Sequence, residues 1–210
     1  MRNRRPATVS LLAGAVALVA TACGSSHTTS HSHSISHSHR MSHSHHLSHA
    51  MTARFGTDCE MVPSNGMGSF HSMSMDPAVT AAEHNPLLTK FAAEVRKAGL
   101  AGQLNSARGI TIFAPDNMAF AKLHGSAMSM LDNPASLAGI LKYHVVQGHV
   151  TPDQFGSVKE FKTLEGDTVK PAKMGSVYEV NTAEVVCGNI ATANATIYVI
   201  NTVLEPMHLH

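Results

Sequence analysis

The apolar residues of this chain change their spacing between its middle and its last third, and this change limits the fold most. After Asn85 they recur at the spacing that is typical of one buried helix face. The residues in this pattern are Leu87, Leu88, Phe91, Ala92, Val95 and Ala98. Short β-branched runs follow later, at 177–180, 184–187, 190–193 and 196–200. Helical patterns followed by strand patterns predict an α+β domain with segregated helices.

Polar residues before prolines mark the expected helix starts, because the first can cap a helix and the second suits its first turn. These sites are Asp76-Pro77, Asn85-Pro86, Asn133-Pro134 and Thr151-Pro152-Asp153. The helix after Asn85 is expected to span about 13 residues, since Gly99 stands where a C-terminal glycine belongs. Asp116 is expected to cap a further helix over 117–123.

Three other segments favour strands. The run 110–113 is apolar and ends at Ala114-Pro115-Asp116, and the run 143–146 ends before Gly148. The segment 158–164 is followed by Glu165-Gly166-Asp167, which is a hairpin turn signal.

The amino-terminal segment has the features of an export signal. A positive start, formed by Arg2, Arg4 and Arg5, precedes an apolar run over 9–20. This run has about twelve residues, whereas a membrane-spanning helix needs about 20. Small residues then precede Cys23, as in the bacterial lipobox, so we expect a signal peptide over 1–22 and lipid on Cys23. The acyl chains would hold the protein at the outer face of the membrane. The alternative is ordinary cleavage beside an incidental cysteine, which would give a secreted protein.

The segment 23–57 is rich in histidine and serine and has few apolar side chains, so we expect a disordered tether. Imidazole suits zinc, copper and nickel, and the methionine thioether favours monovalent copper. The candidate metal ligands are His27, His31, His33, His37, His39, His43, His45, His46 and His49 in the tether, and His71, Met73 and Met75 after it. The alternative is a spacer that only separates the domain from the envelope.

The three cysteines form an odd set. If Cys23 carries lipid, Cys59 and Cys187 remain, and two thiols in an oxidising compartment favour a disulfide. The alternative is two free buried cysteines. Cys59 lies in an expected amino-terminal extension at 58–75, ahead of a main domain at 76–208.

Three motifs that occur in order resemble the signatures of the fasciclin domain. They are Thr111-Ile112-Phe113-Ala114-Pro115-Asp116-Asn117-Met118-Ala119-Phe120, Leu141-Lys142-Tyr143-His144-Val145-Val146 and Ile197-Tyr198-Val199-Ile200-Asn201-Thr202-Val203-Leu204-Glu205-Pro206. The runs Val185-Val186-Cys187-Gly188 and Thr192-Ala193-Asn194-Ala195-Thr196 resemble the secreted and surface-lipoprotein antigens of mycobacteria and their actinobacterial relatives. In those proteins the cysteine that matches Cys187 pairs with an amino-terminal cysteine, which would be Cys59 here. Asn201 departs from the family, which usually has aspartate at that position.

The resemblance implies a part in adhesion for Tyr143 and His144, with a cell-surface or matrix protein or glycan as the partner. The residues themselves favour a different role for His144. It follows a helix and enters an apolar strand, which is typical of a hydrogen-bonded core histidine.

The sequence does not favour catalysis or nucleic-acid binding. It contains no nucleophile elbow, zinc-protease motif or phosphate loop. Asp116, Asp132, Asp153 and Asp167 stand at turn or cap positions, and the net charge of +1 does not predict a basic surface. We therefore expect a binding or adhesion module that is not an enzyme and requires no cofactor. The alternative function is extracytoplasmic capture of zinc, copper or nickel by the tether. A third hypothesis, a small apolar ligand such as a pigment, rests on the resemblance alone.

Overall fold

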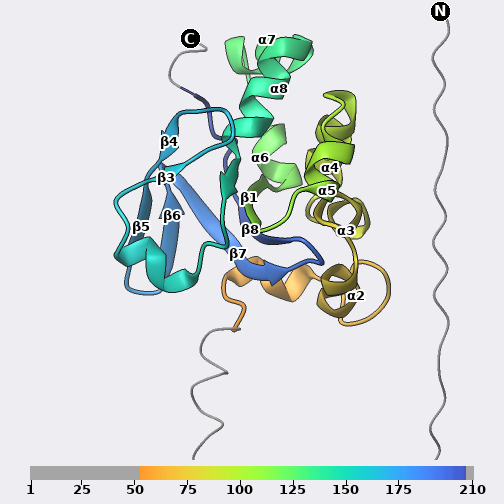
Figure 1. The fold of residues 1–210 in the computed structure, drawn as a ribbon, viewed down its shortest axis with the longest axis vertical. Coiled ribbons are helices and arrows are strands. Elements are labelled where there is room, and N and C mark those ends of the chain that lie inside the picture. Colours follow the sequence, from red (N-terminus) through yellow and green to blue (C-terminus); the bar gives the residue numbers. More distant parts are fainter. Residues whose placement is uncertain (1–52, 207–210) are drawn as a thin grey trace, which may run out of the picture. The chain divides into compact units, whose positions relative to one another are not determined.

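The computed structural model of the protein describes residues 53–206, and two parallel strands from distant parts of the sequence form its centre. β1 (Ile110–Pro115) and β8 (Ala195–Ile200) pair along their whole length. They lie inside a six-stranded sheet with the order β2-β1-β8-β7-β6-β5. The other strands of this sheet are β2 (Val145–Gln147), β5 (Pro171–Met174), β6 (Val177–Val180) and β7 (Ala183–Ala191) (Figure 1).

Side chains alternate across the central strands, so each face of the pair contributes to a separate core. Ile112 and Ile197 belong to the core on the helical face. Phe113 and Tyr198 belong to the core on the opposite face. Because both faces are covered, every residue of β1 is buried. Its one polar side chain, Thr111, donates its hydroxyl to the Gly148 carbonyl oxygen at 2.7 Å.

The helices gather beside one face of the sheet, on the right and at the top of Figure 1. They are α2 (Phe70–Met75), α3 (Ala78–His84), α4 (Thr89–Lys97), α5 (Ala101–Ser106), α6 (Asn117–Ala121), α7 (Ser126–Asp132) and α8 (Pro134–Tyr143). Phe91 and Val95 of α4 and Leu137 of α8 are buried in the helical core. The arrangement confirms the α+β class that the spacing of apolar residues predicts.

The second core is rich in aromatic rings. The 3₁₀ helix η3 (Pro152–Gly156) and a hairpin of β3 (Phe161–Lys162) and β4 (Thr168–Val169) cover it. Phe155 lies with its ring centroid 5.2 Å from that of Tyr198 and 6.3 Å from that of Phe113. Centroid separations of this size are favourable for aromatic pairs, which adds to the stabilisation from burial alone.

Most of the predicted helix ends are confirmed. The Asp116 carboxylate accepts a hydrogen bond from Ala119 N and caps α6. Asn133 Oδ1 accepts from Ala135 N at 2.9 Å and caps α8. Gly99 has φ of 70° directly after the last turn of α4, as its predicted C-terminal role requires.

Two predicted helix starts are wrong. Asn85 Oδ1 accepts from Leu87 N at 2.9 Å, which stabilises a turn, so α4 begins later, at Thr89. Asp76 does not cap α3. The first amide of α3, Ala78 N, donates instead to Asn194 Oδ1 at 2.8 Å.

The strand expected over 143–146 is also wrong in its first half. Tyr143 is the last residue of α8 and His144 is its C-cap, so β2 begins at Val145. The runs at 184–187 and 190–193 belong mostly to one strand, β7. The strand is irregular between the two runs, where Asn189 adopts φ of 59° and the register of pairing with β8 shifts, but it continues to Ala191.

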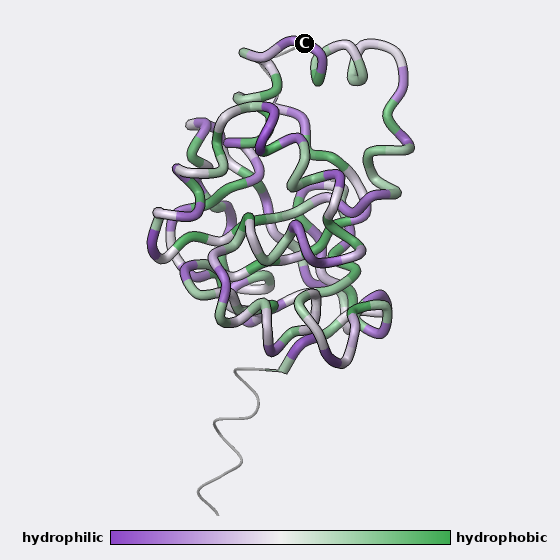
Figure 2. The backbone as a smooth tube through the Cα atoms, turned by 90° about the vertical axis from the view of Figure 1, so that its right-hand side faces the viewer, coloured by the Kyte–Doolittle hydropathy of each residue, from purple (hydrophilic) through white to green (hydrophobic). Residues whose placement is uncertain are grey.

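Figure 2 shows that hydrophobic stretches along the described chain are short and are interrupted by hydrophilic residues. Over residues 53–206, no helix has the length and apolar character needed to cross a membrane. The predicted signal peptide, Cys23 and the tether histidines lie outside the described residues.

Candidate functional site

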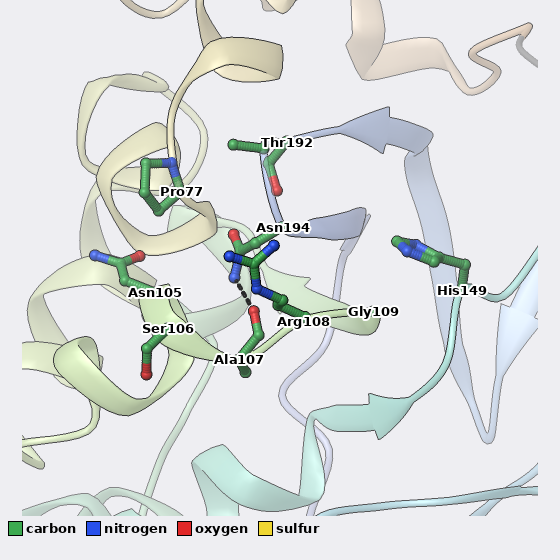
Figure 3. A pocket seen from close by; sticks show the side chains of 10 residues that line it. Pro77, Asn105, Ser106, Ala107, Arg108, Gly109, His149, Thr192 and Asn194 are labelled. Atoms are coloured by element: carbon green, nitrogen blue, oxygen red, sulfur yellow. Dashed lines mark hydrogen bonds between the residues drawn. The ribbon is translucent and has the colours of Figure 1, made fainter. Parts of the chain in front are cut away.

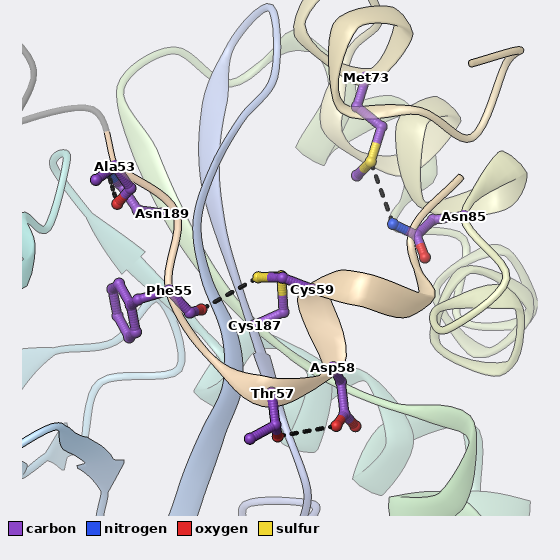
Figure 4. The surroundings of a disulfide bond; sticks show 9 residues. All are labelled: Ala53, Phe55, Thr57, Asp58, Cys59, Met73, Asn85, Cys187 and Asn189. Carbon is purple, nitrogen blue, oxygen red and sulfur yellow. Dashed lines mark hydrogen bonds between the residues drawn. A yellow bond between two sulfur atoms is a disulfide. The ribbon is translucent and has the colours of Figure 1, made fainter. Parts of the chain in front are cut away.

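Cys59 and Cys187 form a disulfide, as predicted (Figure 4). Cys59 lies on the 3₁₀ helix η2 (Thr57–Met61) and Cys187 lies on β7, with a Cα–Cα distance of 4.9 Å. The bond therefore attaches the amino-terminal segment to the sheet across a sequence separation of 128 residues.

The segment before Cys59 follows the sheet closely. Phe55 and Gly188 exchange two backbone hydrogen bonds, of 3.4 and 2.7 Å, although Phe55 falls within the range predicted for the tether. A Cβ atom on Gly188 would lie 2.4 Å from Phe55 Cζ, so any larger residue at this position would force the Phe55 ring to move. Val62 and Met73 of the expected extension are buried in the helical core, which makes 58–75 part of the same body as the main domain.

His144 is a buried core histidine, as its place in the sequence favours. Its side chain is 0% exposed and its Nδ1 lies 2.8 Å from the Ile140 carbonyl oxygen. Leu204 N donates to Nε2 at 2.9 Å. Since the carbonyl can only accept and the amide can only donate, these partners select the neutral tautomer with hydrogen on Nδ1. Burial lowers the pKa of His144 to about 4, although the hydrogen bond with Ile140 opposes this shift.

Tyr143 connects two further chain segments. Its hydroxyl donates to the Thr168 carbonyl oxygen at 3.0 Å and accepts from Asn181 Nδ2 at 3.1 Å. Asn181 has φ of 54°, and its Oδ1 accepts from Lys170 N at 2.9 Å. The adjacent tyrosine and histidine therefore hold together the chain around 168–170, the turn at Asn181 and the segment that ends in Leu204.

These same segments form the walls of a surface groove of about 590 Å³, which we call the Tyr143 groove. Its lining includes Tyr143, Thr168, Lys170, Asn181, Leu204 and Glu205. The adhesion role implied for the Tyr143 and His144 side chains needs correction. At 2% and 0% exposure, neither ring offers a surface on which a macromolecule can pack. Both residues instead determine the shape of the groove.

The sequence pattern did not identify Asn181 as part of this site. A signal was present, since Asn-Thr separates two β-branched runs and asparagine tolerates left-handed backbone conformations. Asn201, where the family usually has aspartate, still accepts a hydrogen bond at Oδ1, from Glu184 N at 3.0 Å. The amide oxygen thus makes a contact that a carboxylate oxygen could also make.

The three metal candidates on α2 do not share one face. Met73 is 0% exposed and its Sδ accepts from Asn85 Nδ2 at 3.2 Å, so its prediction as a metal ligand is wrong. Residues two apart on a helix point to different sides, whereas residues four apart share a side. His71 and Met75 are accordingly both exposed, the latter by 72%. Within residues 53–206, no group of three or more His, Cys, Asp or Glu side chains could hold a metal ion.

Comparisons with known proteins identify relatives of this chain. The sequence profile of the fasciclin domain matches residues 86–206. The immunogenic protein MPB70 of Mycobacterium bovis is 40% identical over 151 residues, which cover 67% of this chain and 75% of that protein. The cell surface glycolipoprotein MPT83 of Mycobacterium tuberculosis is 36% identical over 151 residues, which cover 67% of this chain and 66% of that protein.

Two more distant proteins also match. The transforming growth factor-beta-induced protein ig-h3 of Sus scrofa is 36% identical over 115 residues, which are 54% of this chain and 17% of that protein. A solved FAS1 domain pair from the insect cell adhesion molecule fasciclin I has a TM-score of 0.47 and 20% identity, covering 57% of this chain and 45% of that one. The profile match over more than half of the chain, together with the mycobacterial relatives, shows that this protein belongs to the fasciclin domain family.

Proposed function

We propose that this protein is a non-enzymatic binding module that is held on the outer face of the cell envelope and uses the Tyr143 groove to contact a protein or glycan partner. The observation that carries this proposal is the groove itself. Two adjacent buried side chains join three separate chain segments into one surface. A binding site needs such positioning, because a fixed surface loses less conformational entropy when a partner binds.

The composition of the groove supports binding more than turnover. Lys170, Asn181 and Glu205 surround a tyrosine hydroxyl whose donor and acceptor positions are both used. Asp116, a sequence candidate for chemistry, is buried and caps α6.

The disulfide and the relatives support the extracytoplasmic location. Disulfides persist in oxidising compartments and are rare in the cytosol. The relatives are named as an immunogenic protein and a cell surface glycolipoprotein. We propose lipid on Cys23 as the anchor, with secretion as the alternative. Intact-mass measurement of the mature protein decides between them, because only the anchored form carries acyl mass on its first residue.

Replacing Tyr143 with phenylalanine tests the groove. The change Tyr143→Phe removes both hydroxyl hydrogen bonds and should lower the free energy of unfolding by about 1–3 kcal/mol. Because the groove walls lose a shared support, attachment should weaken about tenfold. The measurement uses beads coated with the mature protein and envelope fragments of the producing bacterium.

Tyr178→Phe provides the matched control. Tyr178 packs against Phe55, with ring centroids 4.0 Å apart, and does not line the groove. This control should retain the attachment of the wild type. Equal attachment by the Tyr143 variant, or no attachment by the folded wild type, would contradict the proposed use of the groove.

A second candidate function, metal capture, is favoured by the composition of the tether. The segment from His27 to His49 contains nine histidines, and several imidazoles can coordinate one ion. We expect calorimetry at pH 7.5 to detect zinc or copper binding by the whole protein. Deletion of 27–49 should abolish most of this binding while circular dichroism of the domain stays unchanged. Undiminished binding after the deletion would rule out the tether as the metal site.

A further inference from the structure

A second hollow opens at the other end of the central strands, away from the Tyr143 groove. It has a volume of about 550 Å³ and lies where β1 and β8 begin (Figure 3). Its lining includes Asn105, Ser106, Arg108, His149, Thr192 and Asn194. We call it the Arg108 cavity. The Tyr143 groove lies beyond the opposite end of β8, so the two sites are separated by the length of that strand.

The floor of the Arg108 cavity is held by asparagine side chains. Asn194 Oδ1 accepts from Ala78 N, and its Nδ2 donates to the carbonyl oxygens of Leu104 and Ala107 at 2.8 and 2.7 Å. Asn105 Oδ1 accepts from Val79 N at 2.9 Å. These amides are committed to joining α3, α5 and β8, so they provide a rigid base rather than ligand contacts.

The groups left to contact a ligand are cationic or polar. Figure 3 shows Arg108 in the middle of the lining side chains and His149 apart from them, on the right. Within residues 53–206, no hydrogen bond or ion pair engages the Arg108 guanidinium, and none of the lining residues carries a carboxylate. His149 Nδ1 lies 3.2 Å from Thr196 Oγ1, and its Nε2 would lie 3.8 Å from a Cβ atom on Gly109. The imidazole therefore rests at the mouth of the cavity.

We propose that the Arg108 cavity binds the carboxylate of a uronic acid unit in an acidic polysaccharide. The planar guanidinium presents paired N–H donors that match the two oxygens of a carboxylate. The Thr192 hydroxyl donates to Ala195 O at 2.9 Å and accepts from Ala195 N at 3.0 Å, so it belongs to the base of the cavity. The Ser106 hydroxyl donates to Gln103 O at 3.1 Å, and its oxygen can still accept a hydrogen bond from a sugar hydroxyl. Apart from Pro77 and two alanines the lining is polar or cationic, so the cavity holds no apolar pocket for a peptide side chain. This site is independent of the Tyr143 groove and gives the protein a second contact.

Titration of the full mature protein with trigalacturonic acid at pH 7.5 tests the proposal. Amide signals followed by two-dimensional NMR should shift at 107–109, at His149 and at 192–194. Arg108→Gln should weaken binding by about tenfold or more, because it removes the paired charge-assisted hydrogen bonds. Neutral galactotriose should bind far more weakly than the acidic trisaccharide.

Arg96→Gln is the matched control, since it removes the same charge from an exposed side chain that pairs with Glu83 at 3.4 Å. It should change the affinity by less than about twofold, because Arg96 does not line the cavity and a charge at a distance on the surface is screened by salt. Equal weakening by both variants would show that only net charge matters and would overturn the site. NMR shifts confined to residues outside the cavity lining would also overturn the site. If inorganic phosphate bound as tightly as the trisaccharide, the assignment to a polysaccharide would fail.

Discussion

Removing the disulfide by the double change Cys59→Ala and Cys187→Ala should lower the free energy of unfolding by about 5 kcal/mol. The bond links residues 128 positions apart, and a loop of that length contributes about this much in the chain-entropy account. Whole domains are stabilised by only about 5–15 kcal/mol, so the loss is a large part of the total. Urea unfolding followed by circular dichroism measures the difference.

Reductant supplies the control for the double variant. Wild-type protein should approach the stability of the variant when it is reduced, whereas the variant should not respond. Loss of the disulfide should also release the amino-terminal segment from the sheet, because Phe55 and η2 contact β7 beside the bond. Hydrogen exchange at Gly188, whose amide donates to Phe55 O, reports this release. Coincident urea transitions for oxidised wild type and the variant would contradict the expected stabilisation.

Acidification should destabilise the wild-type protein through His144 by about 3 kcal/mol between pH 7 and pH 4. The pKa of His144 is lowered to about 4 in the folded protein, against an ordinary value of 6.5. Between these values the unfolded chain binds a proton that the folded protein does not, so stability falls as pH falls. A tenfold change in proton affinity corresponds to about 1.4 kcal/mol, and below about pH 4 this contribution stops changing. Urea unfolding at pH 7, 5.5 and 4 measures the slope.

His144→Gln isolates this contribution. The variant should be less stable than wild type at pH 7 by about 2 kcal/mol, because the hydrogen bonds to Ile140 and Leu204 are disturbed. It should also lose stability less steeply as pH falls, since glutamine does not titrate. His124→Gln, at an exposed position, should keep the wild-type slope. Parallel pH profiles for wild type and the His144 variant would refute the assignment.

Protonation of His144 also has a consequence for the Tyr143 groove. A protonated imidazole cannot accept the hydrogen bond from Leu204 N. The segment that ends in Leu204 and Glu205 forms one wall of the groove. Loss of stability at acidic pH should therefore be accompanied by loosening of this wall.

Local chemistry was enough to predict many elements of the fold. Asp116 and Asn133 cap their helices through amides two or three residues away, and Gly99 ends α4 through its own backbone freedom. The turn at 165–167 joins β3 to β4 as its composition predicts. The cysteine count and the expectation of export were sufficient to predict the bond between Cys59 and Cys187.

Other features depend on partners far away in the sequence. Asn194 caps α3 across 116 residues, and the Tyr143 hydroxyl reaches Thr168 and Asn181 on segments that no local pattern connects to it. Met73 looked like a neighbour of His71 and Met75, but packing turned its side chain toward Asn85.

The order of the residues was therefore sufficient for the type of most elements, for their caps and turns, for the cysteine pair and for the family. Packing in three dimensions was needed to establish which side chains are exposed, how β1 and β8 pair, and how the Tyr143 groove and the Arg108 cavity are assembled. The difference arises from the range of the interactions. Capping and turn preferences act over a few residues and are readable in order along the chain, whereas burial and long-range hydrogen bonds exist only after distant segments have packed together.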